Sequence, residues 1–261
     1  MKNLGLDQPE AGTSRREFTK KSLNAILAVS LLDHLCTADL LAGDGKLTAA
    51  KWLREANELG AALKESKVKP VAWQKQMEAL MRNQIDLAEV FKLIDFDRIT
   101  KTANLPDNGA RSLRPRFPKV EGVTDRLVFG KQVFALKKGR SVVPHGHNNM
   151  ATAFLVLKGN FQGRLYDRVE DAKSHMIIKP TIDDRFGPGT TSSISDAKDN
   201  VHWFKALDEP AFIFNIHVLG LKTRKDTRTG RVYVDPNGEK LDDGLVRAPL
   251  LDYKKAHQLY G

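Results

Sequence analysis

Apolar positions recur three or four residues apart from Lys46 to about Thr102, the spacing that places side chains on one face of a helix. Pro70 separates a first helix from a second, and Asp86 with Glu89 three residues later is typical of a capping box that opens a third. The apolar stripes include Trp52, Leu53, Ala56, Leu59, Leu63, Trp73, Met77, Leu80, Met81, Leu87, Val90, Phe91 and Ile94. The pattern predicts a helical segment over residues 46–103 whose apolar face packs on the C-terminal part of the chain.

The pattern changes after residues 104–118, which are rich in Pro, Gly, Asp and Asn and predict a linker. Short β-like runs divided by Gly, Asp and Pro come next: Arg126–Phe129, Gln132–Leu136, Ser141–Val143, Ala153–Leu157, Phe161–Tyr166, Met176–Ile178, Val201–Phe204 and Ala211–Val218. About eight such strands favour a sandwich or jelly roll over residues 119–222. Residues 223–261 are charged and are expected to form a C-terminal extension that wraps the barrel or lies loose.

Composition narrows the classes of protein that fit. The 261 residues include 42 Lys and Arg against 32 Asp and Glu, and 41% are hydrophobic, which excludes a disordered chain. No apolar stretch approaches the ~20 residues needed to span a bilayer, and one cysteine cannot build a Cys-rich metal site. The excess positive charge lacks an aromatic-interleaved basic stripe, so anionic surfaces or solutes are favoured over nucleic acid.

The N-terminal residues indicate export. Ser14, the pair Arg15-Arg16, Phe18 and Lys20 precede an apolar run over residues 23–32. This arrangement resembles a twin-arginine export signal over residues 1–42, and it predicts a periplasmic or exported protein that uses the twin-arginine machinery. Cleavage is expected between Ala38 and Ala42, and a cut after Ala38 would leave a mature chain without cysteine. The alternative is an ordinary amphipathic first helix with a basic start.

The chemistry concentrates in the run from Gly139 to His147. Residues two apart on an extended backbone point the same way, so His145 and His147 can present both imidazoles to one point. Two neutral imidazole nitrogens at that separation form half of a metal site. The alternative is that they are two polar residues of a loop.

At these residues the chain resembles the cupin superfamily of double-stranded β-helix proteins. The family's first motif is matched by Gly139, His145, His147 and Gly159, with Thr152 where the family carries Glu. The resemblance implies a mainly β, cupin-type jelly roll with an N-terminal helical segment. The family's second motif is degenerate over residues 197–202 and makes His202 the third metal ligand. Its competitor is His217, which also suits a core position.

A narrower resemblance extends from Gly139 to Val218. His-x-His-x-x-Met, a later Gly, Tyr166-Asp167 and then Asn-x-His followed by an apolar strand are similar to the thiol dioxygenases of the cysteamine dioxygenase and plant cysteine oxidase group. That resemblance implies Fe(II) held by His145, His147 and His202, a small-molecule substrate and O₂, and a supporting position for Asn215, where Asp is usual. The Pro-Pro-Tyr that comes after this strand in the family is absent.

Three residues of the strand after Gly159 complete the set of candidates. Arg164, Tyr166 and Arg168 alternate along an extended strand and are therefore expected on one face. Tyr166 is the candidate catalytic residue, while the arginines fit either a carboxylate clamp or a solvated face. Two alternatives to a dioxygenase remain open: a cupin that uses Zn, Mn or Ni for non-oxidative chemistry, and a metal- or ligand-binding module without turnover.

Overall fold

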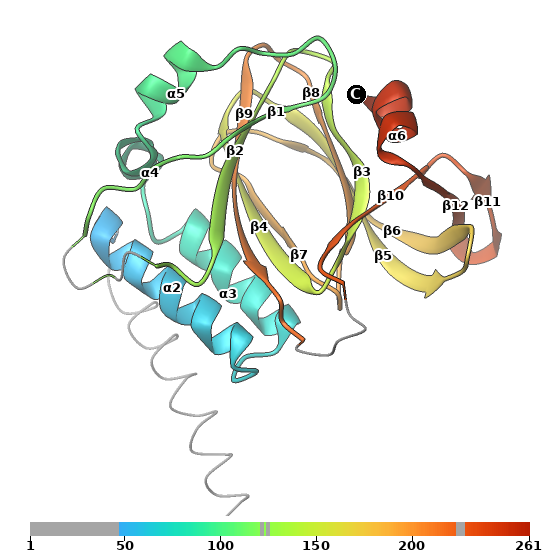
Figure 1. The fold of residues 1–261 in the computed structure, drawn as a ribbon, viewed down its shortest axis with the longest axis horizontal. Helices are drawn as coiled ribbons and strands as arrows, with labels where there is room; N and C mark the ends of the chain where they lie inside the picture. The colour runs from blue at the N-terminus through green and yellow to red at the C-terminus, as the bar shows by residue number, and fades with distance from the viewer. Residues whose placement is uncertain (1–46, 121–122, 124–125, 223–227) are drawn as a thin grey trace, which may run out of the picture. The chain divides into compact units, whose positions relative to one another are not determined.

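The computed structural model describes residues 47–120, 123, 126–222 and 228–261 (Figure 1). The predicted export signal over residues 1–42 lies outside these residues. The described residues form one compact unit. Within the described part of the chain, no helix has the length and apolar character needed to cross a membrane.

Four helices open the described chain, which confirms that the helices lie on its N-terminal side. They are α2 (Ala49–Lys64), α3 (Pro70–Arg82), α4 (Leu87–Ile94) and α5 (Phe96–Thr102). Pro70 begins α3, where its missing N–H costs nothing. Asp86 occupies the N-cap of α4, but its side chain makes no capping hydrogen bond, so the predicted capping box is wrong.

Eight strands form a jelly roll of two facing antiparallel sheets: β2 (Gly130–Leu136), β3 (Ser141–Asn148), β4 (Met150–Lys158), β5 (Phe161–Asp171), β6 (His175–Phe186), β7 (Thr191–Ile194), β8 (Val201–Ala206) and β9 (Ala211–Leu219). Their pairing is nested, because β5 pairs with β6, β4 with β7, β3 with β8 and β2 with β9. A two-stranded ribbon wound in this way is a double-stranded β-helix, which confirms the predicted cupin-type fold class.

The sheets enclose an apolar core on their inner faces. Sheet A has the order β1-β2-β9-β4-β7, in which β1 is the short strand Arg111–Leu113, and sheet B contains β3-β8-β5-β6. Alternation along each strand sends every second side chain inward. The inward side chains include Phe134, Leu136, Phe154, Phe161, Leu165, Phe204 and Ile213. Helix α3 lies against β4 and β7, so the helices cover the outer face of sheet A (Figure 1).

The C-terminal segment extends sheet B and closes it. It contributes β10 (Gly230–Val234), β11 (Glu239–Lys240), a 3-10 turn at Asp242–Gly244, β12 (Val246–Leu251) and α6 (Tyr253–Tyr260). Strand β10 pairs with β3, β12 pairs with β6, and β10 also pairs with β12. The ring β10-β3-β8-β5-β6-β12 encloses a second apolar core beside the first. Sheet B is therefore shared between two cores.

Three details of the strand predictions need correction. Arg126–Phe129 forms no strand. The predicted linker contains β1 (Arg111–Leu113), which pairs with β2 at the edge of sheet A. Strand β7 is absent from the predicted strands, because its sequence shows no apolar alternation, although all four of its residues are buried. Its neighbours on α3 supply polar partners, as Gln74 Nε2 donates to the Ser193 carbonyl over 3.0 Å.

Candidate metal centre

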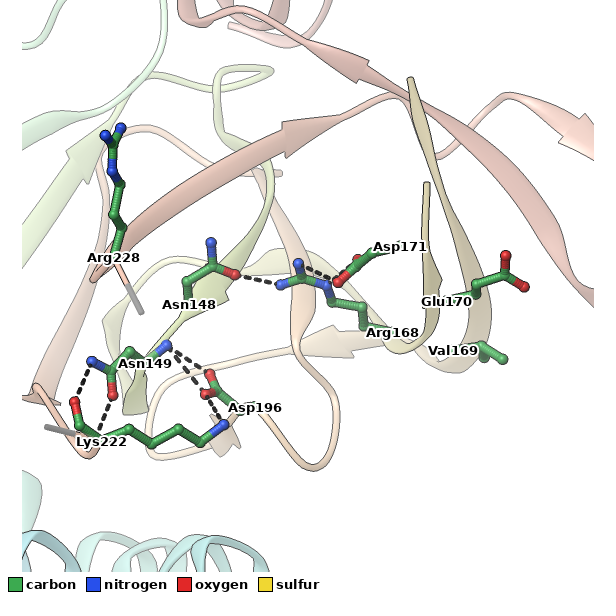
Figure 2. Close-up of a pocket in the computed structure, with 9 residues that line it drawn as sticks. All are labelled: Asn148, Asn149, Arg168, Val169, Glu170, Asp171, Asp196, Lys222 and Arg228. Carbon is green, nitrogen blue, oxygen red and sulfur yellow. Dashed lines mark hydrogen bonds and ion pairs between the residues drawn. The ribbon is translucent and has the colours of Figure 1, made fainter. Parts of the chain in front are cut away.

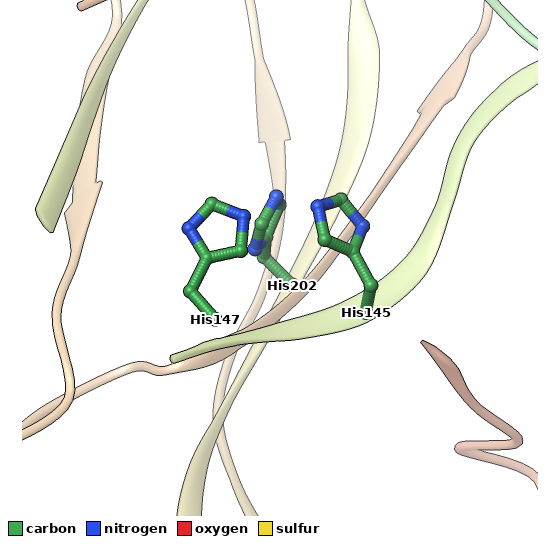
Figure 3. Close-up of side chains that lie close together, drawn as sticks. All are labelled: His145, His147 and His202. Atoms are coloured by element: carbon green, nitrogen blue, oxygen red, sulfur yellow. The ribbon is translucent and has the colours of Figure 1, made fainter. Parts of the chain in front are cut away.

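Adjacent strands of sheet B bring the three predicted histidines together (Figure 3). His145 and His147 lie two apart on β3, and His202 lies on β8 directly opposite His145. Val142 and His145 lie three residues apart, so regular alternation would send them to opposite faces of sheet B. A register shift between them reverses the phase of β3, and both Val142 and His145 face the inner core. The bulge therefore turns the histidine pair inward, toward His202.

The three imidazoles are close enough for one ion. Their ring centroids are 4.9 Å apart for His145 and His147, 4.2 Å for His145 and His202, and 5.0 Å for His147 and His202. One nitrogen from each ring lies within 4.8 Å of the other two. All three residues are buried, with at most 5% of their surface exposed. No other group of three or more possible ligands occurs among the described residues.

Hydrogen bonding leaves three nitrogens without a partner. The Nδ1 of His145 lies 2.7 Å from the Val143 carbonyl, so Nδ1 carries the proton and Nε2 keeps its lone pair. The buried Nε2 atoms of His145 and His147 and the buried Nδ1 of His202 have no hydrogen-bond partner in the chain. Unpaired buried polar atoms are costly, and the free Nε2 atoms of His145 and His147, in rings that converge with His202, fit a bound cation.

Electrostatics keep the three rings neutral. Burial, and then the charge of neighbouring rings, lower the pKa of His145 and His147 well below the usual value of 6.5. Burial, followed by the charge of Arg231, lowers the pKa of His202 to about 3. Neutral imidazoles offer lone pairs, so the site is ready to bind a metal near pH 7 without first losing protons.

Asn200 fixes the backbone of His147. Its side-chain Oδ1 accepts a hydrogen bond from the His147 N–H over 3.1 Å, and its Nδ2 donates to the His147 carbonyl over 2.8 Å. The same Nδ2 also donates to the Ser195 carbonyl. Gly146 allows this approach, because a Cβ there would lie 2.7 Å from the Asn200 Oδ1. Asn200 is not among the residues predicted from the sequence, although it lies two residues before His202.

Thr152 stands where the cupin motif carries Glu. Its Oγ1 lies 3.4 Å from the Nδ1 of His147, so it contacts the back of that ring and supplies no carboxylate to the cluster. His217 is the cross-strand partner of Thr152 and is half-buried at the same end of the barrel. It is not one of the three converging histidines. Asn215, two residues before it, is buried, and its Oδ1 has no partner.

Tyr166 and Arg164 lie on the other side of sheet B. Tyr166 packs in the second core, beside Met176 and Val201, and the structure does not bring it to the histidines. The guanidinium of Arg164 lies 4.9 Å from the Trp203 ring centroid and pairs with Asp183. The pairing of β5 with β8 is regular from Phe161 to Tyr166, so Arg164 and Tyr166 share one face of the strand. The catalytic role of Tyr166 stays a prediction that the structure does not test.

Arg168 connects the cluster to a polar pocket (Figure 2). Its Nη1 donates to the His147 carbonyl and to Asn148 Oδ1, and its other nitrogens bind Asp171. The pocket has a volume of about 360 Å³, and its lining also includes Asn149, Val169, Glu170, Asp196, Lys222 and Arg228. This lining carries both signs of charge. Arg168 supports the backbone of β3, because its Nη1 binds the His147 carbonyl.

Comparison with known proteins gives distant likeness alone. The chain matches no known family and no curated protein sequence. Among solved structures, procruciferin from Brassica napus is 12% identical, with a TM-score of 0.29 over 36% of this chain and 21% of its own. A double-stranded β-helix protein from Klebsiella pneumoniae is 12% identical, with a TM-score of 0.33 over 51% of this chain and 86% of its own. An oxalate oxidase in complex with glycolate is 15% identical, with a TM-score of 0.36 over 51% of this chain and 60% of its own. This chain therefore spans about a fifth of the length of procruciferin.

Proposed function

We propose that the chain is a metal-dependent cupin enzyme, a non-haem Fe(II) dioxygenase that acts on a small thiol or a related small molecule. One observation carries the proposal: three buried imidazoles each place a nitrogen within 4.8 Å of a nitrogen of the other two. His145, His147 and His202 would hold the ion. Imidazole suits iron as well as zinc, nickel and copper, and the absence of a carboxylate from the cluster leaves room for a substrate and O₂.

Ferrous iron held by three neutral imidazoles would lower the pKa of a thiol and hold thiolate and dioxygen side by side. The overall reaction is R–SH + O₂ → R–SO₂H. Both oxygen atoms become bonded to sulfur, the sulfur is oxidised by four electrons, and dioxygen accepts those four electrons. No further co-reactant is needed.

The chain's own contribution is orientation and exclusion of water. The Val143 carbonyl holds the ring of His145, while Asn200 holds the backbone of His147. The rings of Phe154 and Phe204 lie 5.1 Å and 5.9 Å from the His202 ring and form an apolar floor. A dry, rigid site of this kind strengthens interactions with charged reactants and protects reactive species from water.

The test combines metal content with oxygen uptake. We expect elemental analysis of the protein purified from its native compartment to find one iron per chain, and the iron-loaded protein to consume O₂ when small thiols are added. His147→Ala should abolish both properties and leave the barrel folded. The matched control is His175→Ala, at the start of β6 and outside the cluster.

Each other outcome overturns the dioxygenase proposal in a defined way. Zinc, manganese or nickel with no oxygen uptake would identify a non-oxidative cupin enzyme. Bound metal with no turnover of any thiol would identify a binding module. Full metal content in His147→Ala would show that the histidine cluster does not hold the ion.

We also propose that residues 1–42 direct export through the twin-arginine pathway, on the sequence pattern around Arg15 and Arg16. This pathway carries folded proteins, so a metal would be inserted before export. The metal that the chain receives would then depend on availability in the compartment of synthesis rather than on relative affinity alone.

A further inference from the structure

Strand β10 presents two side chains to the histidine cluster. Arg231 is the direct cross-strand partner of His147, and Tyr233 is that of His145. Directly opposed residues of an antiparallel pair project from the same face. Val234, the next residue, packs into the second core on the other face of sheet B. Arg231 and Tyr233 therefore project on the side of the histidines, and the Tyr233 ring lies 5.8 Å from that of His145.

Arg231 lies where the edges of the two sheets face each other. Its guanidinium carbon is 5.8 Å from the ring centroid of Phe134, an inner-core residue of β2 in sheet A. The residue is exposed to solvent, and it makes no ion pair with the described residues. A cation that reaches from one sheet toward the other, accessible and without a counter-charge, is available to a ligand that enters between them.

The cavity at this end of the barrel is lined by positive and neutral residues. On the neighbouring strands β2 and β9 of sheet A, Gln132 pairs with Asn215, and His217 lies within electrostatic reach of Arg231. A cavity of about 350 Å³ opens at this end, lined by Gln132 and His217 together with Arg114 and Lys131. None of its lining residues is acidic. The charge of Arg231 also lowers the pKa of every histidine in the cluster.

A divalent ion in the cluster would increase this imbalance. Three neutral imidazoles leave the ion its full double charge, and Arg231 adds a third positive charge nearby. Such a site repels an ammonium group and attracts an anion, and the guanidinium offers paired N–H donors that match a carboxylate. The geometry favours a ligand that contacts the metal at one end and Arg231 at the other.

We propose that the substrate of this site is a small molecule with a carboxylate group, which Arg231 binds at the open edge of the barrel while the reacting end lies at the histidine cluster. The proposal rests on the proposed metal centre and narrows its substrate class. Arg231 thus acts as a specificity-determining residue that selects against substrates bearing an ammonium group.

The experiment compares three thiols of similar length on cobalt(II)-loaded protein, with the visible spectrum of cobalt as the readout. The probes are 3-mercaptopropionate, which carries a carboxylate, 2-mercaptoethanol, which is uncharged, and cysteamine, which carries an ammonium group. We expect 3-mercaptopropionate to bind at least about ten-fold more tightly than cysteamine. Arg231→Gln should weaken 3-mercaptopropionate about ten-fold and leave 2-mercaptoethanol unchanged, whereas Arg231→Lys should retain part of the preference.

Arg164→Gln is the matched control, since it removes the same charge from the opposite face of the same sheet. Cobalt affinity measured without any thiol gives a second readout. It should rise in Arg231→Gln, because a repelling charge is lost, and stay constant in Arg164→Gln.

The outcomes separate this inference from the proposed function. If cobalt and all three thiols bind but Arg231→Gln leaves their relative affinities unchanged, the carboxylate inference is overturned and the metal centre stands. If cobalt does not bind to wild type, or binds equally well to His147→Ala, the proposed metal centre fails and the inference fails with it. Bound cobalt that none of the thiols perturbs would contradict thiol chemistry and this substrate class together.

Discussion

His145 and His202 face each other directly across strands β3 and β8, with ring centroids 4.2 Å apart. Neighbouring strands hold the two rings, so their separation is fixed by the hydrogen-bonded ladder rather than by mobile loops. His147 joins them from the same strand as His145. A site placed on paired strands is preorganised, and binding of an ion requires little reordering of the chain.

Binding of a divalent metal is expected to stabilise the protein through these rings. Iron(II) or cobalt(II) at about one hundred times its dissociation constant should add about 2.7 kcal/mol to the free energy of unfolding. For a domain of this size, that corresponds to a rise in Tm of about 5 to 10 °C. His202→Ala should abolish the rise, and differential scanning calorimetry with and without metal measures it. An undiminished shift in His202→Ala would place the bound metal elsewhere.

Asn200 is predicted to support the site through the backbone of His147. Asn200→Ala removes three buried hydrogen bonds, to the His147 N–H, the His147 carbonyl and the Ser195 carbonyl, and leaves the His147 carbonyl with Arg168 as its side-chain donor. We expect a loss of about 2–4 kcal/mol in the free energy of unfolding, measured by urea denaturation. Metal affinity should fall about ten-fold, as for other residues that orient ligands. The exposed Asn237→Ala serves as control, and equal behaviour of the two variants would show that Asn200 has no supporting role.

A side chain at position 146 is predicted to lower the stability of the protein. In Gly146→Ala the new Cβ would lie 2.7 Å from Asn200 Oδ1 and 3.2 Å from a methyl group of Val201. Overpacking of this kind costs about 1–3 kcal/mol, which thermal unfolding would measure. Gly230, two positions away across the β3–β10 ladder, has open space around it, so Gly230→Ala should change stability by less than about 0.5 kcal/mol. Similar losses in both variants would argue against this explanation.

Gln74 is predicted to fasten helix α3 to strand β7. Its Nε2 donates to the Ser193 carbonyl, and its Oε1 accepts from the Ser195 hydroxyl over 2.6 Å. Gln74→Leu leaves both groups unpaired in the interior and should cost about 2–3 kcal/mol of stability without changing metal affinity. The neighbouring exposed Lys75→Ala should be nearly neutral. A change in metal affinity would mean that the helices influence the site directly.

The arginine pair is predicted to be required for export. In a host with twin-arginine machinery, replacing Arg15 and Arg16 together by lysine should retain the protein in the cytoplasm, because the receptor reads the paired guanidinium groups rather than charge alone. Cell fractionation and immunoblotting measure this. The matched control replaces Lys20 and Lys21 by arginine and should leave export intact. Undisturbed export of the Arg15, Arg16 double variant would refute the signal.

The sequence pattern predicted what is encoded locally. His145 and His147 share a face because they lie two apart on one strand, and the flanking glycines placed them in the barrel. The strand β7 was missed because Thr191 and its serines show no apolar alternation, and their burial depends on partners from α3, more than one hundred residues earlier. Polar residues at buried positions cannot be recognised before those partners are known.

Local sequence patterns could not predict the side of sheet B on which other side chains lie. Alternation placed Arg164 and Tyr166 on one face of their strand, but it could not decide which side of the sheet that face would be. Sheet B has an apolar core on each face, so alternation alone cannot show which core a given set of residues faces. Arg231 went unnoticed for a related reason: a charged residue in a charged segment carries no sign that its strand will pair with the histidine strand.

Closure of sheet B by β10 and β12 makes the C-terminal segment part of the proposed active site rather than an appendage. Without it, β3 would become an outer strand with a row of unsatisfied amide and carbonyl groups along the histidine motif, which is a template for self-association. A shortened chain would thus lose both the wall that carries Arg231 and its resistance to aggregation. Shortening the C-terminus to obtain a minimal domain would therefore damage this protein at its most important strand.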